Sequence, residues 1–192
     1  MASTLKNIIA HIQQLYALPE DLLQDFTALL TEESHPKNHV LLREGRVEHK
    51  MYFIERGIAR AFCYRDEREI TFWFGAEGDV FFSYNSYVAD KPGYESVELL
   101  EDSLLYSISY KAIRQLFDTQ IELANWGRRL AEHELIKTES CFIGLQFQSA
   151  IERYKNLLET NPALIQRVQL GHIASYLGVS QVTLSRIRAE LR

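Results

Sequence analysis

The last two dozen residues constrain the fold of this chain most, because they combine two short helical patterns with a tight turn between them. The first pattern holds four apolar residues spaced i, i+3, i+4 and i+7: Leu170, Ile173, Ala174 and Leu177. This spacing predicts one buried helical face. Gly178 follows and can adopt the positive φ that a sharp turn needs, and Ser180 is a good N-cap for the next helix.

The second helical pattern has two chemically different faces. Leu184, Ile187 and Leu191 share an apolar face, and an amide, a hydroxyl, a guanidinium and one small apolar side chain lie on the other, at Gln181, Ser185, Arg186 and Val182. This arrangement is typical of a helix-turn-helix, whose second helix enters the DNA major groove. A generic pair of packed helices shares the apolar spacing but does not require such a polar face. We therefore expect double-stranded DNA as a partner.

The charge distribution favours a nucleic-acid partner at this end of the chain, although the chain as a whole is acidic. The formal net charge is −5. Residues 151–192 hold six basic and three acidic residues, a net +3, so residues 1–150 carry −8. For DNA binding, the location of positive charge matters more than the total.

Membrane and secretory segments are not expected. No apolar run approaches the length needed to cross a bilayer, and the N-terminus lacks the basic and apolar regions of a secretory signal. Cys63 and Cys141 are far apart in the sequence. Reduced thiols in a cytoplasmic protein are the simplest account of them, while a regulatory disulfide stays open.

The rest of the chain changes its pattern twice. Residues 1–35 have helical apolar spacing. Seven short β-prone runs follow, separated by glycine or charged turns, at 39–43, 50–55, 59–64, 70–74, 80–84, 96–100 and 104–109. Strands at this spacing predict a sandwich or small barrel, so the expected fold class is α+β.

Helical patterns return after the β-prone region. Residues 110–117 predict a short helix, residues 119–142 a long one, and residues 146–159 a further one that Asn161-Pro162 ends. The long helix has a partly apolar seam made of Leu123, Trp126, Leu130, His133 or Glu134, Lys137 and Cys141. A helix that packs on its own β-domain and a helix that joins two copies both fit this seam.

Short motifs occur along the chain in a definite order. They are Leu42-Arg-Glu-Gly45, Met51-Tyr-Phe-Ile-Glu-Arg-Gly57, Gly78-Asp79, the strand at 101–109 and the C-terminal helix-turn-helix. In this order the chain resembles the cyclic-nucleotide-receptor/fumarate-nitrate-regulator (CRP/FNR) family of bacterial transcription factors over almost its whole length. The resemblance implies a double-stranded β-helix (a jelly roll of the cyclic-nucleotide-binding type) that senses a small-molecule effector. It also implies a homodimer on a two-fold-symmetric operator, with RNA polymerase as a further partner.

The resemblance divides the chain into three expected segments. Residues 1–118 would form the sensor domain, residues 119–145 a long dimerisation helix, and residues 146–192 the helix-turn-helix domain. Many family members have a β-hairpin wing after the second helix. The given sequence stops at Arg192, so no wing is expected.

The resemblance also assigns DNA-contacting residues. In the family, the first two residues after the N-cap serine and an arginine four positions further on reach base edges. Here these residues are Gln181, Val182 and Arg186. The Arg186 guanidinium would make a bidentate contact to guanine. The hydroxyls of Ser180 and Thr183 would bind DNA phosphates. Phosphate contacts position the protein on the duplex without specifying sequence. The candidate DNA-binding residues are Ser180, Gln181, Val182, Thr183, Ser185 and Arg186.

The expected effector pocket departs from that of the cyclic AMP binders. Those members have a Gly-Glu pair where this chain has Phe82-Ser83, and an Arg-Ser pair where it has Glu95-Ser96. A carboxylate at Glu95 would repel a cyclic phosphate and lacks the two-pronged donor of arginine. We therefore expect an effector other than cyclic AMP. The candidate pocket residues are Phe82, Ser83, Tyr84, Glu95, Ser96, His133 and Glu134.

No cofactor, metal site or enzyme activity is expected. Residues 1–35 contain no cysteine for an iron–sulfur centre, and no spacing singles out one of the six histidines as a haem ligand. No catalytic constellation and no phosphate-binding glycine loop occurs, so no catalytic residue is expected.

Two other functions stay open. The same β-fold hosts cupin-like metalloenzymes, but their sites need histidines on facing strands, and residues 50–109 contain none. A degenerate sensor domain, its pocket filled by Phe81, Phe82, Tyr84 and Tyr87, would instead make the chain an effector-independent DNA binder or interaction module.

Overall fold

The computed structural model describes residues 5–66 and 68–191. Contacts divide the chain into two compact units. The first unit comprises residues 1–61 and 74–132, and the second comprises residues 62–73 and 133–192. The division therefore falls inside a long helix and within the two strands of a β-hairpin.

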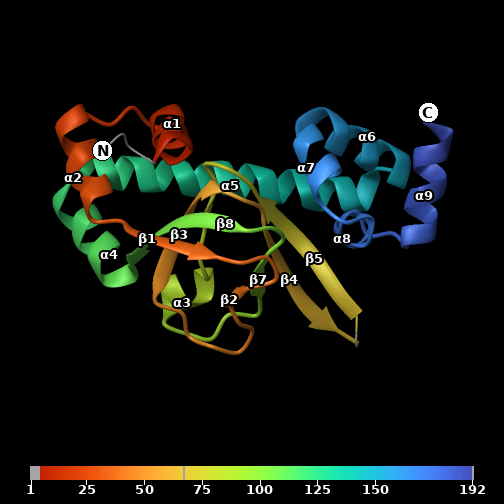
Figure 1. The fold of residues 1–192 in the computed structure, drawn as a ribbon, viewed down its shortest axis with the longest axis horizontal. Helices are drawn as coiled ribbons and strands as arrows, with labels where there is room; N and C mark the ends of the chain where they lie inside the picture. Colours follow the sequence, from red (N-terminus) through yellow and green to blue (C-terminus); the bar gives the residue numbers. More distant parts are fainter. Residues whose placement is uncertain (1–4, 67, 192) are drawn as a thin grey trace. The chain divides into compact units, whose positions relative to one another are not determined.

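Helices and strands follow the expected order along the described residues (Figure 1). The strands are β1 (Thr31–His35), β2 (Val40–Leu42), β3 (Lys50–Arg56), β4 (Ala59–Arg65), β5 (Arg68–Gly75), β6 (Val80–Phe81), β7 (Ser96–Leu99) and β8 (Ser103–Ser109). The helices are α1 (Lys6–Leu15), α2 (Glu20–Ala28), α3 (Tyr84–Ala89), α4 (Tyr110–Thr119), α5 (Ile121–Phe147), α6 (Ala150–Thr160), α7 (Pro162–Arg167), α8 (Leu170–Tyr176) and α9 (Gln181–Glu190).

The strands form two four-stranded sheets, with the orders β1-β8-β3-β6 and β2-β7-β4-β5. In the first sheet β8 lies antiparallel between β1 and β3, where Ser107 is opposite both Thr31 and Tyr52 (Figure 1). In the second sheet β5 is an edge strand. Two such sheets with flanking helices confirm the expected α+β class with a jelly-roll domain.

Three stretches differ from the sequence-based expectation. Thr31–His35 is strand β1 and not helix, because it pairs along its whole length with β8. Residues 82–84 do not extend β6, because the Ser83 hydroxyl accepts the N–H of Ser86 and begins α3 there. Pro162 does not only end α6 but also occupies the first turn of α7, where proline is well tolerated. The expected helical region also included residues 1–4, which lie outside the described residues.

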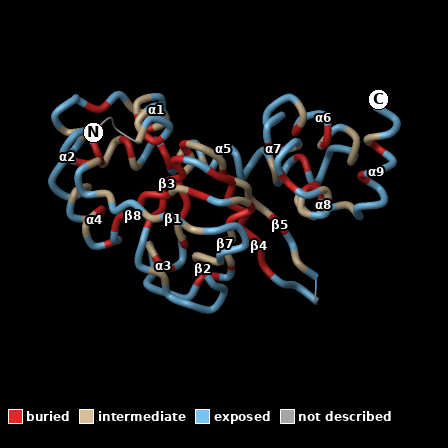
Figure 2. Tube along the Cα trace, viewed as in Figure 1, coloured by how far each residue is buried: buried red, intermediate tan, exposed pale blue. Residues whose placement is uncertain are grey.

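An aromatic core joins helices and sheet in the first unit. Phe26 of α2 packs against Phe53 of β3 with ring centroids 5.9 Å apart, and Trp126 of α5 lies 5.8 Å and 6.1 Å from these two rings. Buried residues run along β3 in Figure 2. Leu123, Trp126 and Leu130 are buried, which confirms the first part of the expected seam of α5.

A buried carboxylate fixes the first helix to the β-domain. Glu55, only 6% exposed, accepts hydrogen bonds from the N–H groups of Asn7 and Ile8 at 3.1 to 3.2 Å. The Asn7 amide returns a hydrogen bond to the Glu55 carbonyl at 2.8 Å. The first turn of a helix has unsatisfied N–H groups and a partial positive charge, so an acidic side chain from β3 can cap it.

Candidate nucleic-acid interface

Two helices of the second unit cross over a small apolar core, as the sequence predicts. Ile173, Ala174 and Leu177 of the first helical face are buried, and so are Leu184 and Ile187 of the second. Leu170 is half-buried. The expectation for Leu191 was wrong: it is 40% exposed, because α9 ends at Glu190 and Leu191 is its C-cap.

The turn between α8 and α9 depends on a glycine. Gly178 has a φ of +67°, the left-handed conformation that only glycine adopts without strain. Its N–H donates to the Ser175 carbonyl at 3.0 Å, and the next N–H, of Val179, donates to the Ala174 carbonyl at 3.0 Å. These bonds satisfy carbonyls at the end of α8, so the turn and α8 form one rigid piece.

An arginine of α6 secures the same turn from outside. Arg153 donates from Nε and Nη2 to the Leu177 carbonyl at 3.0 and 2.8 Å, and from Nη1 to the Gln148 carbonyl. Sequence reasoning counted Arg153 only as a positive charge. The residue carries no spacing signal for this role, because the carbonyl it binds lies 24 positions further along the chain.

Ser180 begins α9 as predicted. Its hydroxyl accepts the N–H of Thr183 at 3.1 Å, and the two hydroxyl oxygens lie 2.9 Å apart. Both residues remain exposed. The helix therefore starts with two exposed hydroxyls at the positive end of its dipole, a combination suited to a phosphate.

Four exposed residues form what we call the reading face of α9: Gln181, Val182, Ser185 and Arg186. Val182 is 63% exposed, whereas Leu184 and Ile187 on the other face of α9 are buried. In the described part of the chain, the Arg186 guanidinium makes no hydrogen bond or ion pair with another residue. The reading face thus offers an uncommitted guanidinium, an amide and an apolar contact on one side of a well-supported helix.

Phe82, Ser83, Tyr84 and Glu95 of the expected effector pocket lie in the first unit. The Phe82 ring is 4.5 Å from that of Tyr84 and 6.4 Å from that of Tyr110. The Ser83 N–H donates to the Tyr110 hydroxyl at 3.1 Å, and burial raises the pKa of Tyr110 well above its usual range. The region around Phe82 is therefore filled by the chain's own aromatic side chains.

The Glu95 carboxylate lies beside Ser83. A Cβ placed on Gly93 would lie 2.7 Å from both Glu95 Oε1 and Ser83 Oγ. Glu95 is 7% exposed. Ser96 is used differently, since its hydroxyl accepts the N–H of Glu44 at 3.0 Å.

His133 and Glu134, the other two expected pocket residues, lie in the second unit. His133 is exposed. Glu134 accepts hydrogen bonds from Trp73 Nε1 at 3.3 Å and from Lys137 Nζ at 2.8 Å. Its carboxylate thus ties α5 to β5.

In the same unit, burial and the neighbouring Cys141 raise the pKa of Tyr176 to about 12.

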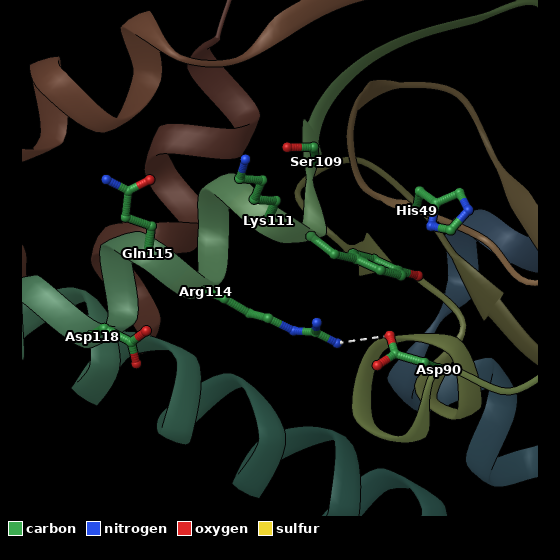
Figure 3. Close-up of a pocket in the computed structure, with 8 residues that line it drawn as sticks. His49, Asp90, Ser109, Lys111, Arg114, Gln115 and Asp118 are labelled. Carbon is green, nitrogen blue, oxygen red and sulfur yellow. Dashed lines mark hydrogen bonds and ion pairs between the residues drawn. The ribbon is translucent and has the colours of Figure 1, made fainter.

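A cavity of about 440 Å³ opens at the start of α4 (Figure 3). Its lining includes both charge signs, and Arg114 points across it to Asp90 with an N–O distance of 3.5 Å. Of the expected pocket residues, none lines it. Within the described residues, no cluster of three or more potential metal ligands occurs, and no helix has the length and hydropathy to span a membrane.

Comparisons with known proteins agree with this architecture. Residues 32–120, from β1 to the end of α4, match the cyclic nucleotide-binding domain family. No curated protein sequence matches the chain significantly.

Solved structures share the fold. FixK2 from Bradyrhizobium japonicum is 22% identical, with a TM-score of 0.75 over 84% of each chain. CLP from Xanthomonas campestris, described as a c-di-GMP responsive global regulator, is 20% identical, with a TM-score of 0.70 over 90% of this chain and 91% of its own. A protein of Eubacterium rectale described as a transcriptional regulator of the crp/fnr family is 15% identical, with a TM-score of 0.67 over 90% of this chain and 83% of its own.

The positive φ of Gly178 predicts that adding a methyl group at this position lowers the stability of the fold. We expect Gly178→Ala to lower the free energy of unfolding by at least about 1 kcal/mol, because alanine is strained at positive φ. The added Cβ would also lie 3.2 Å from Leu145 Cδ2. Gly171→Ala is the matched control, since Gly171 lies in α8 and alanine should stabilise a helix there by about 0.5–1 kcal/mol. Urea unfolding of both variants measures the difference, and equal stabilities would contradict the assigned turn.

Proposed function

By fold the chain is a CRP/FNR-type protein with a cyclic nucleotide-binding domain, and on that premise we propose that it is a DNA-binding transcription regulator. Residues 1–118 act as the sensor, residues 119–145 join two copies, and residues 146–192 bind a two-fold-symmetric operator. RNA polymerase is a further partner in this proposal, and the cytoplasm is the site of action.

The single observation that carries the proposal is the reading face of α9. Its four side chains are exposed, while Leu184 and Ile187 on the opposite face hold the helix against α8. In a helix-turn-helix such a face contacts base edges. Ser180 and Thr183 supply the phosphate contacts at the start of the same helix.

The second half of α5 supports a homodimer. Ile136, Ile143 and Phe147 are 61%, 46% and 76% exposed. Ile136 and Ile143 are seven residues apart and therefore lie on one side of the helix, away from Glu134 and Cys141. Exposed apolar side chains at this spacing form helix–helix interfaces between copies. A two-fold axis between two such helices would present two copies of α9 to a palindromic operator.

The environment of Glu95 bears on the effector. A buried carboxylate beside Ser83 opposes a cyclic phosphate, and aromatic side chains fill the space around Phe82. We therefore propose that the effector is not cyclic AMP. The same crowding supports the alternative that the sensor domain is degenerate and DNA binding is independent of an effector.

The first functional prediction concerns Arg186. Arg186→Ala should weaken binding to a selected operator by about 1–3 kcal/mol and relax base preference at one position of each half-site. Selection from random duplexes followed by fluorescence anisotropy measures both effects. Arg188→Ala removes the same charge from a half-buried position on α9 and should leave base preference intact. A wild-type protein that is indifferent to every duplex would reject the proposed function.

The second functional prediction concerns assembly. The double variant Ile136→Glu/Ile143→Glu should elute as a monomer, because four carboxylates cannot be buried together at a helix pair. Light scattering after gel filtration gives the mass directly. Val88→Glu is the control: Val88 is 75% exposed on α3, and its substitution should leave a dimer intact. A dimeric double variant would place the interface elsewhere.

The third functional prediction concerns the ligand. Calorimetric titration with cyclic AMP should give no binding heat up to about millimolar concentration, because a carboxylate repels the phosphate at close range. Micromolar binding would show that Glu95 is not at the phosphate position.

A further inference from the structure

A serine of the helix-turn-helix binds the outer edge of β5. Among the described strands, β5 is the last of its sheet. The Ser175 hydroxyl accepts the N–H of Thr71 at 2.9 Å and donates to the Glu69 carbonyl at 3.0 Å. These two backbone groups belong to residues i and i+2 of one strand and therefore point the same way. One hydroxyl thus occupies the place of a strand partner.

A second contact lies on the same face of α8. His172, three residues before Ser175, has its Nδ1 3.9 Å from Glu69 Oε1. Residues three apart on a helix are neighbours, so both side chains meet the same short stretch of β5. Thr71 is only 2% exposed, which means that its N–H cannot exchange Ser175 for bulk water without local opening.

Whatever fixes α8 also fixes α9. The N–H groups of Gly178 and Val179 donate to carbonyls of α8. Arg153 donates to the carbonyl of Leu177, the C-cap of α8. The reading face follows this turn directly. A shift of Ser175 relative to β5 would therefore move the reading face with it.

We infer that Ser175 is a positioning residue for DNA binding, which attaches the helix-turn-helix to the end of the β4–β5 hairpin. This inference rests on the proposed function. The hairpin end, residues 62–73, belongs to the same compact unit as α8 and α9, whereas its two strands continue into the β-domain at residues 61 and 74. The hairpin end, α8 and α9 thus lie in one compact unit, and Ser175 joins two of these elements within it.

Valine and threonine at position 175 give a matched test, because they have the same shape and differ by the hydroxyl. In Ser175→Val, amide hydrogen exchange at Thr71 should be at least about tenfold faster than in Ser175→Thr, which keeps both hydrogen bonds. Affinity for the selected operator should fall about three- to tenfold in the valine variant with base preference unchanged, since no base-contacting side chain is altered. Threonine should restore wild-type affinity. Ser140→Ala, at an exposed position of α5, controls for loss of a serine hydroxyl.

The outcomes separate the inference from the function it rests on. Equal exchange at Thr71 in the valine and threonine variants would overturn the contact. Faster exchange with unchanged operator affinity would overturn the positioning role. If the wild-type chain binds no duplex, the proposed function and the positioning role fail together, while the exchange comparison still decides whether Ser175 holds the strand edge.

Discussion

The crossing of α8 and α9 is the constraint on which the helix-turn-helix depends. Ala174 is small, and the chain must reverse within a few residues so that α8 and α9 bury their apolar faces, which include Ile173 and Leu184. Only a left-handed residue at Gly178 allows that reversal. When the apolar faces of α8 and α9 are packed together, the opposite side of α9 faces solvent. The reading face lies on this side.

An aromatic cluster lies around the start of α3 in the β-domain. The Phe82 ring packs against those of Tyr84 and Tyr110, and Tyr84 is 50% exposed, so the cluster reaches the surface. The Glu95 side chain is buried beside Ser83 in the same unit. Fold alone does not identify an effector.

Packing across the edge of β5 gives the β-hairpin a role beyond the sheet. An unpaired strand edge is a liability that proteins commonly cover, and Ser175 covers it here from a helix rather than from a strand. Glu134 adds a second attachment through the Trp73 indole. The hairpin end consequently belongs to the same unit as the helix-turn-helix, although its strands are part of the β-domain sheet.

Local patterns in the sequence determined the elements whose causes are local. The spacing of Ile173, Ala174 and Leu177, the glycine at 178 and the cap at Ser180 specify the helix-turn-helix, because each acts within one or two helical turns. Tertiary structure alone decided that 31–35 is a strand, that Glu55 caps α1, that Arg153 binds the turn and that Ser175 pairs with β5. In each of these cases the partner lies tens of residues away, and hydrogen bonds between groups so far apart in the sequence leave no periodic signal in the chain.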